Sequence, residues 1–368
     1  MTVLLTGAAG FIGYHVAEAL LGAGTPVIGV DNLNPYYDVR LKQARLDRLT
    51  PHPGFTFHPI DIADRAALAA LAAAHPAIDI IVHLAAQAGV RHSLVDPHAY
   101  VQTNVVGHLV VLEVARRLPR LRHLVYASTS SVYGANQTLP FRETDQTATP
   151  LSLYAATKLA DELMGHAYAH LFRIPQTGLR FFTVYGPWGR PDMAYYSFAR
   201  AIAAGEPITL YDDGRLKRDF TYIDDIVAGI VGVLDRPPGP ATAPPPLVAG
   251  GGGEGTNAAD PTPPPTPHPQ REGDPGASVP SPAGTAPPAR VLNIGNHRAE
   301  EVRTLVALLE QGLGRKAVVR SAPRPAADVA ETFASVAAIG QLAGFTPSVS
   351  LAEGIGRFVA WFRAFHGV

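Results

Sequence analysis

Two side chains that together could move a proton lie one helical turn apart near the middle of the chain. The run Tyr154-Ala155-Ala156-Thr157-Lys158 falls in a predicted helix, so Tyr154 and Lys158 share one face. An unperturbed tyrosine has a pKa of about 10 and is a poor base at neutral pH. A lysine ammonium one turn away would stabilise the phenolate and lower that pKa. Alone, the pair could equally be a solvated helix face. The hydroxyl-rich segment Ser128-Thr129-Ser130-Ser131, at the end of a preceding strand, favours a chemical role.

A glycine-rich turn near the N-terminus could bind phosphate. The run Gly7-Ala8-Ala9-Gly10-Phe11-Ile12-Gly13 follows a predicted strand and begins a predicted helix. Its glycines permit a tight turn and close approach to a pyrophosphate, and the helix N-terminus offers free N–H groups. Asp31 ends the next strand, 18 residues after Gly13. A carboxylate there can accept hydrogen bonds from an adenosine ribose and would repel a 2′-phosphate. The pattern therefore favours NAD over NADP, although each feature alone could be an ordinary turn.

Short β-branched runs alternate with helical patterns through the first half of the chain. The expected buried strands are Val3–Leu5, Val27–Val30, Phe55–Phe57, Ile80–Leu84, Leu124–Ala127 and Thr177–Phe181. The expected helices are Tyr14–Gly22, Arg65–His75, Tyr100–Leu118 and Leu153–Phe172. This alternation indicates βαβ units and a parallel sheet. The predicted fold class is therefore α/β, a doubly wound parallel (Rossmann) sheet with a smaller C-terminal α/β lobe.

The second half of the chain is interrupted by a change in composition. Residues 236–290 hold half of the chain's 34 prolines and almost no aromatic or large aliphatic residues. Such a segment cannot bury enough apolar area to fold, so we expect a disordered surface insertion. Order is expected to resume with the strand Val291–Ile294 and the helices Val302–Leu313 and Ile355–Phe365. We expect residues 1–182, 220–235 and 290–296 to form the Rossmann domain, and 183–219 with 297–368 to form the lobe.

Bulk properties exclude several classes of function. The formal net charge is −1 and no basic stripe is present, which argues against a nucleic-acid partner. The absence of cysteine excludes disulfides and fits a reducing compartment. None of the 14 histidines has metal-ligand spacing, so no metal is expected. No apolar run reaches the ~18 residues of a membrane span, and no secretory signal precedes the first strand. We therefore expect a cytoplasmic enzyme.

The glycine spacing, Gly-x-x-Gly-x-x-Gly, resembles that of the extended, nucleotide-sugar-modifying branch of the short-chain dehydrogenase/reductase superfamily. Further matches are Asp61-Ile62 after the third strand, Leu84-Ala85-Ala86-Gln87 after the fourth, and Asn104 in a helix. The resemblance implies an NAD site formed by Gly7, Gly10, Phe11, Ile12, Gly13, Asp31, Asn32, Asp61, Ile62, Leu84, Ala85, Ala86, Gln87, Asn104, Ser128, Tyr154 and Lys158. It also implies that Tyr154 removes a sugar hydroxyl proton, that Thr129 hydrogen-bonds the same oxygen, and that Lys158 holds the nicotinamide ribose.

The segment from Leu124 to Gly134 is similar to that of sugar-nucleotide epimerases. Relatives that dehydrate their sugar have Asp-Glu directly after the threonine, and UDP-glucuronate decarboxylases have a glutamate at the second place. Ser130 and Ser131 stand at those positions here, so no general acid is available to expel water. Serine hydroxyls are instead suited to binding a carboxylate. The comparison favours epimerisation through a 4-keto sugar, with NAD regenerated in each turnover.

The segment Arg180–Ala194, with its run Gly-Pro-Trp-Gly-Arg-Pro-Asp-Met-Ala, resembles UDP-glucuronate 4-epimerases closely. A 4-keto uronic acid is a β-keto acid, so such an enzyme must hold the carboxylate to prevent loss of CO₂. Our hypothesis is that Arg190, Thr183, Ser130 and Ser131 form the carboxylate pocket, with Arg190 as the charged partner. Arg190 could instead be a surface residue or hold the diphosphate. Arg91 is the second candidate for the carboxylate.

The resemblance extends to the nucleotide end of the substrate. Arg218 matches an arginine that meets the UDP diphosphate in relatives, and Asp328 matches an acidic residue near the nucleotide ribose. Ala327 stands where relatives have a glycine before that acid. The family also suggests a homodimer formed through the helices of Asn104 and Tyr154.

The sequence thus predicts an NAD-dependent epimerase that converts UDP-glucuronate to UDP-galacturonate. Two alternatives stay open. One is a related enzyme, either a UDP-glucose/UDP-galactose 4-epimerase or a UDP-glucuronate decarboxylase. The other is an inactive NAD-binding module whose Pro-rich insertion recruits a partner, although the intact set of Thr129, Tyr154 and Lys158 argues against it.

Overall fold

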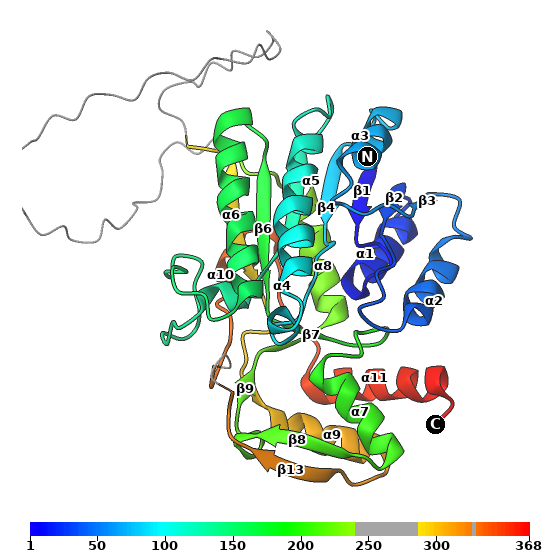
Figure 1. The fold of residues 1–368 in the computed structure, drawn as a ribbon, viewed down its shortest axis with the longest axis vertical. Helices are drawn as coiled ribbons and strands as arrows, with labels where there is room; N and C mark the ends of the chain where they lie inside the picture. The colour runs from blue at the N-terminus through cyan, green and yellow to red at the C-terminus, as the bar shows by residue number, and fades with distance from the viewer. Residues whose placement is uncertain (240–285, 326–328) are drawn as a thin grey trace, which may run out of the picture.

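The structure, a computed structural model, describes residues 1–239, 286–325 and 329–368. Its central feature is a seven-stranded parallel sheet with the order β11-β6-β5-β4-β1-β2-β3 (Figure 1). The strands are β1 (Val3–Thr6), β2 (Val27–Val30), β3 (Phe55–His58), β4 (Ile80–His83), β5 (His123–Thr129), β6 (Gln176–Phe181) and β11 (Ala289–Ile294). The strand order reverses between β1 and β4, where α/β sheets bind ligands. The predicted doubly wound sheet is confirmed.

Helices cover both faces of this sheet because its strands are apolar on both sides. Val3 and Leu5 of β1 belong to one core cluster with side chains of α1 (Phe11–Gly22) and α8 (Ile223–Leu234). Leu4, between them, belongs to a second cluster with α3 (Arg65–Ala74) and α5 (Gly107–Ala115). The long helix α6 (Leu153–Phe172) packs against β5, β6 and α5.

A smaller lobe lies beyond the carboxyl ends of the strands, in the lower part of Figure 1. It contains α7 (Ala194–Ala204), the parallel pair β8 (Pro207–Tyr211) and β13 (Val318–Ala322), α9 (Val302–Leu313) and α11 (Leu351–His366). Two separate strand pairs lie where the chain passes between the main sheet and the lobe: β7 (Thr183–Tyr185) with β10 (Phe220–Tyr222), and β9 (Lys217–Arg218) with β12 (Glu300–Glu301). The helix α10 (Ala337–Ala343) packs on α8 and β11.

The structure refines one expected helix and adds another. The helix predicted over Tyr100–Leu118 is present but not uniform: it begins in α4 (Pro97–Tyr100), widens into a π-helical stretch at Val101–Val106 and continues as α5, which ends at Ala115. Apolar periodicity does not reveal the wider turn, which is typical of functional sites. The helix α2 (Val39–Leu49) was not expected at all, because charged residues interrupt its apolar pattern. Asp38 caps it by accepting a hydrogen bond from the Arg40 N–H at 3.0 Å.

Most of the predicted Pro-rich insertion lies outside the described residues, as does Asp328. The strand expected at Val291 begins two residues earlier, at Ala289. Among the residues that the structure describes, no helix has the length and apolar character needed to cross a membrane.

Candidate active site

A single cavity of about 440 Å³ runs from the glycine-rich turn, past the carboxyl ends of β4, β5 and β6, to the start of the lobe. This volume is in the range of small-molecule sites. The predicted residues that line it are Gly7, Gly10, Phe11, Ile12, Gly13, Asp31, Asn32, Ile62, Leu84, Ala85, Ala86, Gln87, Ser128, Thr129, Ser130, Ser131, Tyr154, Lys158, Thr183, Arg190 and Arg218. Residues predicted for cofactor, chemistry and substrate thus meet in one space.

The glycine-rich turn has room for backbone only. Gly7 adopts a φ of 74°, and a Cβ added there would lie 2.8 Å from the backbone nitrogen of Ala85. A Cβ on Gly13 would lie 2.0 Å from the Gly7 carbonyl oxygen. The first N–H groups of α1 have no intrahelical partners, and the residues that bear them line the cavity. The turn therefore fits the diphosphate of a dinucleotide, which such N–H groups bind.

Asp31 is buried at the end of β2, where it both orders the turn and lines the cavity. Its carboxylate accepts hydrogen bonds from the N–H of Ala9 at 3.2 Å and of Leu33 at 2.8 Å. The Lys42 ammonium lies 3.4 Å from the same carboxylate. Sequence reasoning missed Lys42 because it lies on the unexpected helix α2.

Two predicted cofactor residues, Asp61 and Asn104, do not line the cavity, but each bonds a residue that does. Asp61 accepts a hydrogen bond from the Asn32 side chain at 2.9 Å. Asn104 is buried in the π-helical stretch and bonds both backbone groups of Gln87, accepting from its N–H at 2.8 Å and donating to its carbonyl at 3.1 Å. It also donates to the Thr157 hydroxyl at 3.0 Å. Asn104 thereby joins the segment after β4 to α6.

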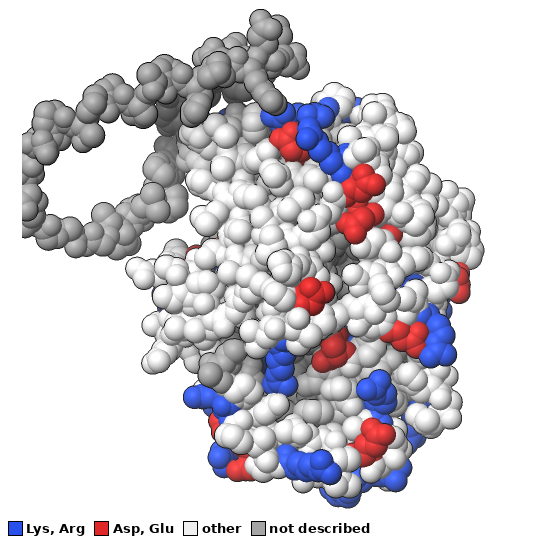
Figure 2. Space-filling model, in the orientation of Figure 1, with Lys and Arg blue, Asp and Glu red and all other residues white. Residues whose placement is uncertain are grey.

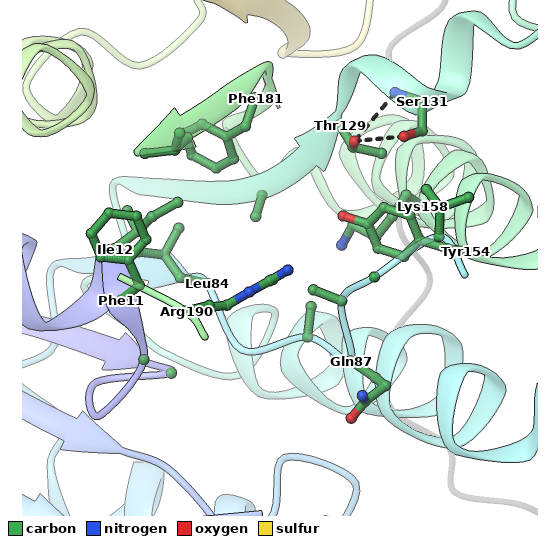
Figure 3. Close-up of a pocket in the computed structure, with 18 of the residues that line it drawn as sticks. Phe11, Ile12, Leu84, Gln87, Thr129, Ser131, Tyr154, Lys158, Phe181 and Arg190 are labelled. Carbon is green, nitrogen blue, oxygen red and sulfur yellow. Dashed lines mark hydrogen bonds between the residues drawn. The ribbon is translucent and has the colours of Figure 1, made fainter. Parts of the chain in front are cut away.

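Thr129 and Tyr154 come from different elements but face the same part of the cavity (Figure 3). Thr129 ends β5, and its hydroxyl accepts from the Ser131 N–H at 3.2 Å and donates to the Ser131 hydroxyl at 3.3 Å. Tyr154 is in the first turn of α6, which begins where the Ser152 hydroxyl accepts the Ala155 N–H at 3.1 Å. A strand end and a helix start thus bring the two hydroxyls to one wall.

Lys158 lies one turn further along α6 and is almost fully buried. Its ammonium donates to Asp161 at 2.6 Å, within a pair whose side chains are 2% and 0% exposed. Burial raises the pKa of Asp161 to about 6, against the opposing effect of Lys158. Sequence reasoning missed Asp161, although its position three residues after Lys158 on one helix face was a usable signal.

A buried ion pair fixes the strand ends on which this wall depends. Arg180 of β6 binds Glu162 of α6 with two hydrogen bonds, at 2.9 and 2.7 Å. Glu162 also accepts from the Ser128 hydroxyl at 2.5 Å. The geometry is bidentate, which adds directional precision as well as energy. Ser128, predicted to contact the cofactor, is therefore held in place from behind.

Arg190 extends into the cavity from the loop after β7 (Figure 3). Its guanidinium donates to both carboxylate oxygens of Asp192, at 3.1 and 2.9 Å. Asp192 also accepts from the Tyr36 hydroxyl at 3.2 Å, which connects the loop to the segment after β2. Ser130, Ser131 and Thr183 line the same cavity. One guanidinium, which is paired with Asp192, and three hydroxyls thus line the space that a carboxylate would occupy.

The remaining substrate candidates occupy different places. Arg91 lies outside the cavity lining, with its guanidinium 4.6 Å from the centre of the Tyr211 ring in β8. Arg218 lines the cavity at the lobe, and it donates to the Lys217 carbonyl at 2.8 Å and to the Ala330 carbonyl at 3.4 Å. Among the described residues, no cluster of His, Cys, Asp or Glu could hold a metal ion.

Comparisons with known proteins agree with this geometry. Residues 3–242 match the model of the NAD dependent epimerase/dehydratase family. A probable UDP-glucuronate 4-epimerase of Rhizobium meliloti is 45% identical over 98% of this chain and 97% of that protein. UDP-glucuronate 4-epimerase 1 of Arabidopsis thaliana is 41% identical over 100% of this chain and 78% of that protein. The crystal structure of UDP-glucuronic acid 4-epimerase from Bacillus cereus with UDP-glucuronic acid and NAD has a TM-score of 0.80 and 29% identity, covering 99% of this chain and 100% of that chain.

Proposed function

The chain belongs to the NAD dependent epimerase/dehydratase family, and from that premise we propose that it inverts C4 of UDP-glucuronate to give UDP-galacturonate. The observation on which this depends is the single cavity that contains a dinucleotide turn, the Thr129–Tyr154 wall and a guanidinium. The relatives named UDP-glucuronate 4-epimerase support the same reaction. When bound, NAD accepts the C4 hydride and returns it to the opposite face of the sugar.

The residues of the chain supply the proton chemistry and the orientation. Tyr154 takes the C4 hydroxyl proton as C4 is oxidised and returns it when the ketone is reduced. Thr129 hydrogen-bonds the same oxygen and fixes its place relative to the phenol. Lys158, one turn further along α6, lines the same cavity and holds the nicotinamide ribose. Asp161 fixes the ammonium of Lys158 from behind.

The 4-keto sugar must rotate within the site, so that its opposite face receives the hydride, without losing its carboxylate. Arg190 supplies a charge-assisted partner for the C6 carboxylate, and Ser130, Ser131 and Thr183 supply hydroxyl donors. Loss of CO₂ requires the C5–C6 bond to overlap with the π system of the C4 carbonyl. If the carboxylate is held near the plane of the sugar ring, this overlap is poor and the loss of CO₂ is suppressed. Arg218 supplies positive charge for the UDP diphosphate at the lobe.

The direct test incubates the purified protein with UDP-glucuronate and separates the nucleotide sugars. We expect UDP-galacturonate as the product and tightly retained NAD. A UDP-pentose with release of CO₂ would indicate a decarboxylase, and conversion of UDP-glucose alone would indicate a neutral-sugar epimerase. The absence of any turnover by NAD-loaded protein would favour a binding module.

We also propose that the protein is a cytoplasmic homodimer. Large apolar side chains are exposed on the π-helical stretch, α5 and α6, among them Val101 (43%), Leu109 (39%) and Leu163 (65%). Figure 2 shows few charged side chains over these helices in that view. Such a face is typical of an interface between copies. Sedimentation should give twice the chain mass, and Leu163→Glu should shift it toward a monomer.

A further inference from the structure

Arg45, on the unexpected helix α2, is fully buried (0% exposed) although it is an arginine. Its guanidinium donates to the Ala9 carbonyl at 2.8 Å and to the Tyr37 hydroxyl at 2.7 Å. It also donates to the Trp188 carbonyl at 2.6 and 3.1 Å and to the Gly189 carbonyl at 3.2 Å. Because a guanidinium has five N–H groups, every donor is used. The contacts join segments 143 residues apart in the chain.

The acceptors of Arg45 are three carbonyl oxygens and a phenol, all neutral. Its charge is therefore buried without a carboxylate partner among the described residues. Burying a charge in this way is costly, and a hydrophobic side chain would often serve packing as well or better. Packing alone is thus a poor reason for an arginine at this position. The contacts themselves indicate the purpose.

The first contact is with the dinucleotide turn. Ala9 lies between Gly7 and Gly10, and the two peptide groups beside its Cα are both held: its N–H donates to Asp31 and its carbonyl accepts from Arg45. The second of these peptides carries the Gly10 N–H, so its orientation helps to set the backbone that leads into α1. Arg45 therefore contributes to the geometry of the diphosphate site, and its positive charge lies beside that site.

The second contact is with the loop that bears Arg190. Trp188 has a φ of 60°, a conformation that is costly for a bulky residue and persists only when its surroundings enforce it. Two of the five bonds of Arg45 go to the carbonyl of this residue, and another goes to Gly189, directly before Arg190. Release of these bonds would allow the loop to relax and would move the Arg190 backbone.

We propose that Arg45 is a positioning residue that ties the cofactor turn to the Trp188–Arg190 loop, so that the grip of Arg190 on the C6 carboxylate depends on it. This inference rests on the proposed function and adds a residue that touches neither cofactor nor sugar. The two binding events become coupled through one guanidinium. A cofactor bound at the turn then favours the loop conformation that holds the acid group.

The proposal has a chemical consequence that can be measured. If the carboxylate of the 4-keto uronate is released, the C5–C6 bond breaks and CO₂ leaves. The electron pair of that bond stays on C5, conjugated with the C4 ketone as an enolate, and C5 then takes up one proton. The product is a UDP-4-keto-pentose, which no longer has the acid group. If this ketone leaves before the hydride is returned, one reduced cofactor remains for each CO₂ lost. If the hydride is returned to C4, a UDP-pentose forms and the cofactor is regenerated, so CO₂ release is the quantity to measure in both cases.

The experiment compares Arg45→Met, Arg45→Lys and Arg40→Met, each loaded with NAD, for KM, kcat and the fraction of turnovers that end in CO₂. Arg40 is the control because it lies on the same helix, is exposed, and pairs with the exposed Asp38. For Arg45→Met we expect a rise of about tenfold in both the KM for UDP-glucuronate and the CO₂ fraction, since charged hydrogen bonds are lost. Arg45→Lys should give a smaller rise in both, because an ammonium has three donors and no fork. Arg40→Met should match the wild type.

A folded, NAD-loaded Arg45→Met protein with a wild-type CO₂ fraction would overturn the proposal. So would a change in thermal stability alone, which is what a packing role predicts. If Arg45→Met does not fold, an unchanged CO₂ fraction in Arg45→Lys overturns it instead. Failure of the proposed function is separate, because it appears as a wild type that forms no UDP-galacturonate. In that case amide exchange of residues 186–193, measured without sugar, decides the role of Arg45: faster exchange in Arg45→Met supports the tie, and unchanged exchange contradicts it.

Discussion

The cofactor side of the cavity is built mainly from backbone, whereas the side that would face the sugar's acid group is built from long side chains. On the cofactor side, Gly7 and Gly13 matter because they have no side chain: a Cβ at either position would collide with backbone atoms. Arg190 defines the other side, and its position depends on Asp192, Tyr36 and, through the loop, Arg45. The difference teaches that the cofactor turn depends on the absence of side chains at two positions, while substrate choice depends on side-chain contacts between distant segments.

The largest expected effect concerns the chemistry that both sides serve. Tyr154→Phe removes the proton-transfer group, so kcat should fall by about 10²–10⁴-fold while NAD stays bound. Tyr168→Phe on the same helix is the control, because its hydroxyl bonds Glu113 away from the cavity. Retained kcat in Tyr154→Phe would mean that another group moves the proton.

The next effect tests the rigidity of the cofactor side. Gly13→Ala places a methyl group against the Gly7 carbonyl, so NAD affinity should fall by ~10–100-fold, in line with the cost of overpacking. Gly22→Ala in the same helix should have no effect on NAD affinity, since a Cβ there meets nothing within 4 Å. Isothermal titration of the apo-protein measures both. Equal NAD affinity in the two variants would remove the steric argument.

A smaller and more selective effect is expected on the side of the cavity that would face the sugar's carboxylate. Arg190→Ala should lower kcat/KM for UDP-glucuronate by ~10–100-fold, the loss of a charged hydrogen bond. Binding of UDP-glucose, which has no carboxylate, should change by less than about twofold. Arg190→Lys should recover part of the loss. If both sugars lose affinity equally, Arg190 holds the diphosphate and not the acid group.

The last effect is on stability and not on turnover, and it concerns the sheet that supports the cofactor side. Burial lowers the pKa of His83 to about 3 and that of His123 to about 4. The unfolded chain binds protons at these residues near pH 6.5 and the folded chain does not. The contribution of these two histidines to the free energy of unfolding is therefore complete above about pH 6.5. It should fall by about 1.4 kcal/mol per pH unit per histidine as the pH drops toward 4.

Urea unfolding at several pH values measures this slope, and a His123→Gln variant should have a slope smaller by about one proton. His98→Gln is the control because His98 is exposed. An identical slope in His123→Gln and the wild type would show that another group takes up the proton.

Local patterns predicted the cofactor side and the proton-transfer pair. The glycine spacing, Asp31, and the turn between Tyr154 and Lys158 are all short-range signals, and the structure brings these residues to one cavity. The strands of the sheet could also be predicted from the sequence, because they are apolar on both faces and therefore appear as short continuous apolar runs. These features need no knowledge of distant segments.

The parts that sequence reasoning missed depend on contacts between distant segments or on unusual local geometry. Arg45 acts on carbonyl oxygens far along the chain, and backbone acceptors leave no trace in residue types. The π-helical turn around Asn104 has the same apolar pattern as an ordinary helix. Arg91 was placed with the substrate by its neighbours in sequence, yet its guanidinium packs against the Tyr211 ring in the lobe.

The central claim is that one cavity oxidises and re-reduces C4 while it holds the acid group at C6. UDP-glucuronate with deuterium at C4 tests it most directly, with mass spectrometry and NMR of the product. The account predicts UDP-galacturonate that retains the deuterium at C4, because the hydride never leaves the site. Loss of the deuterium to solvent, or a product inverted at another carbon, would contradict it.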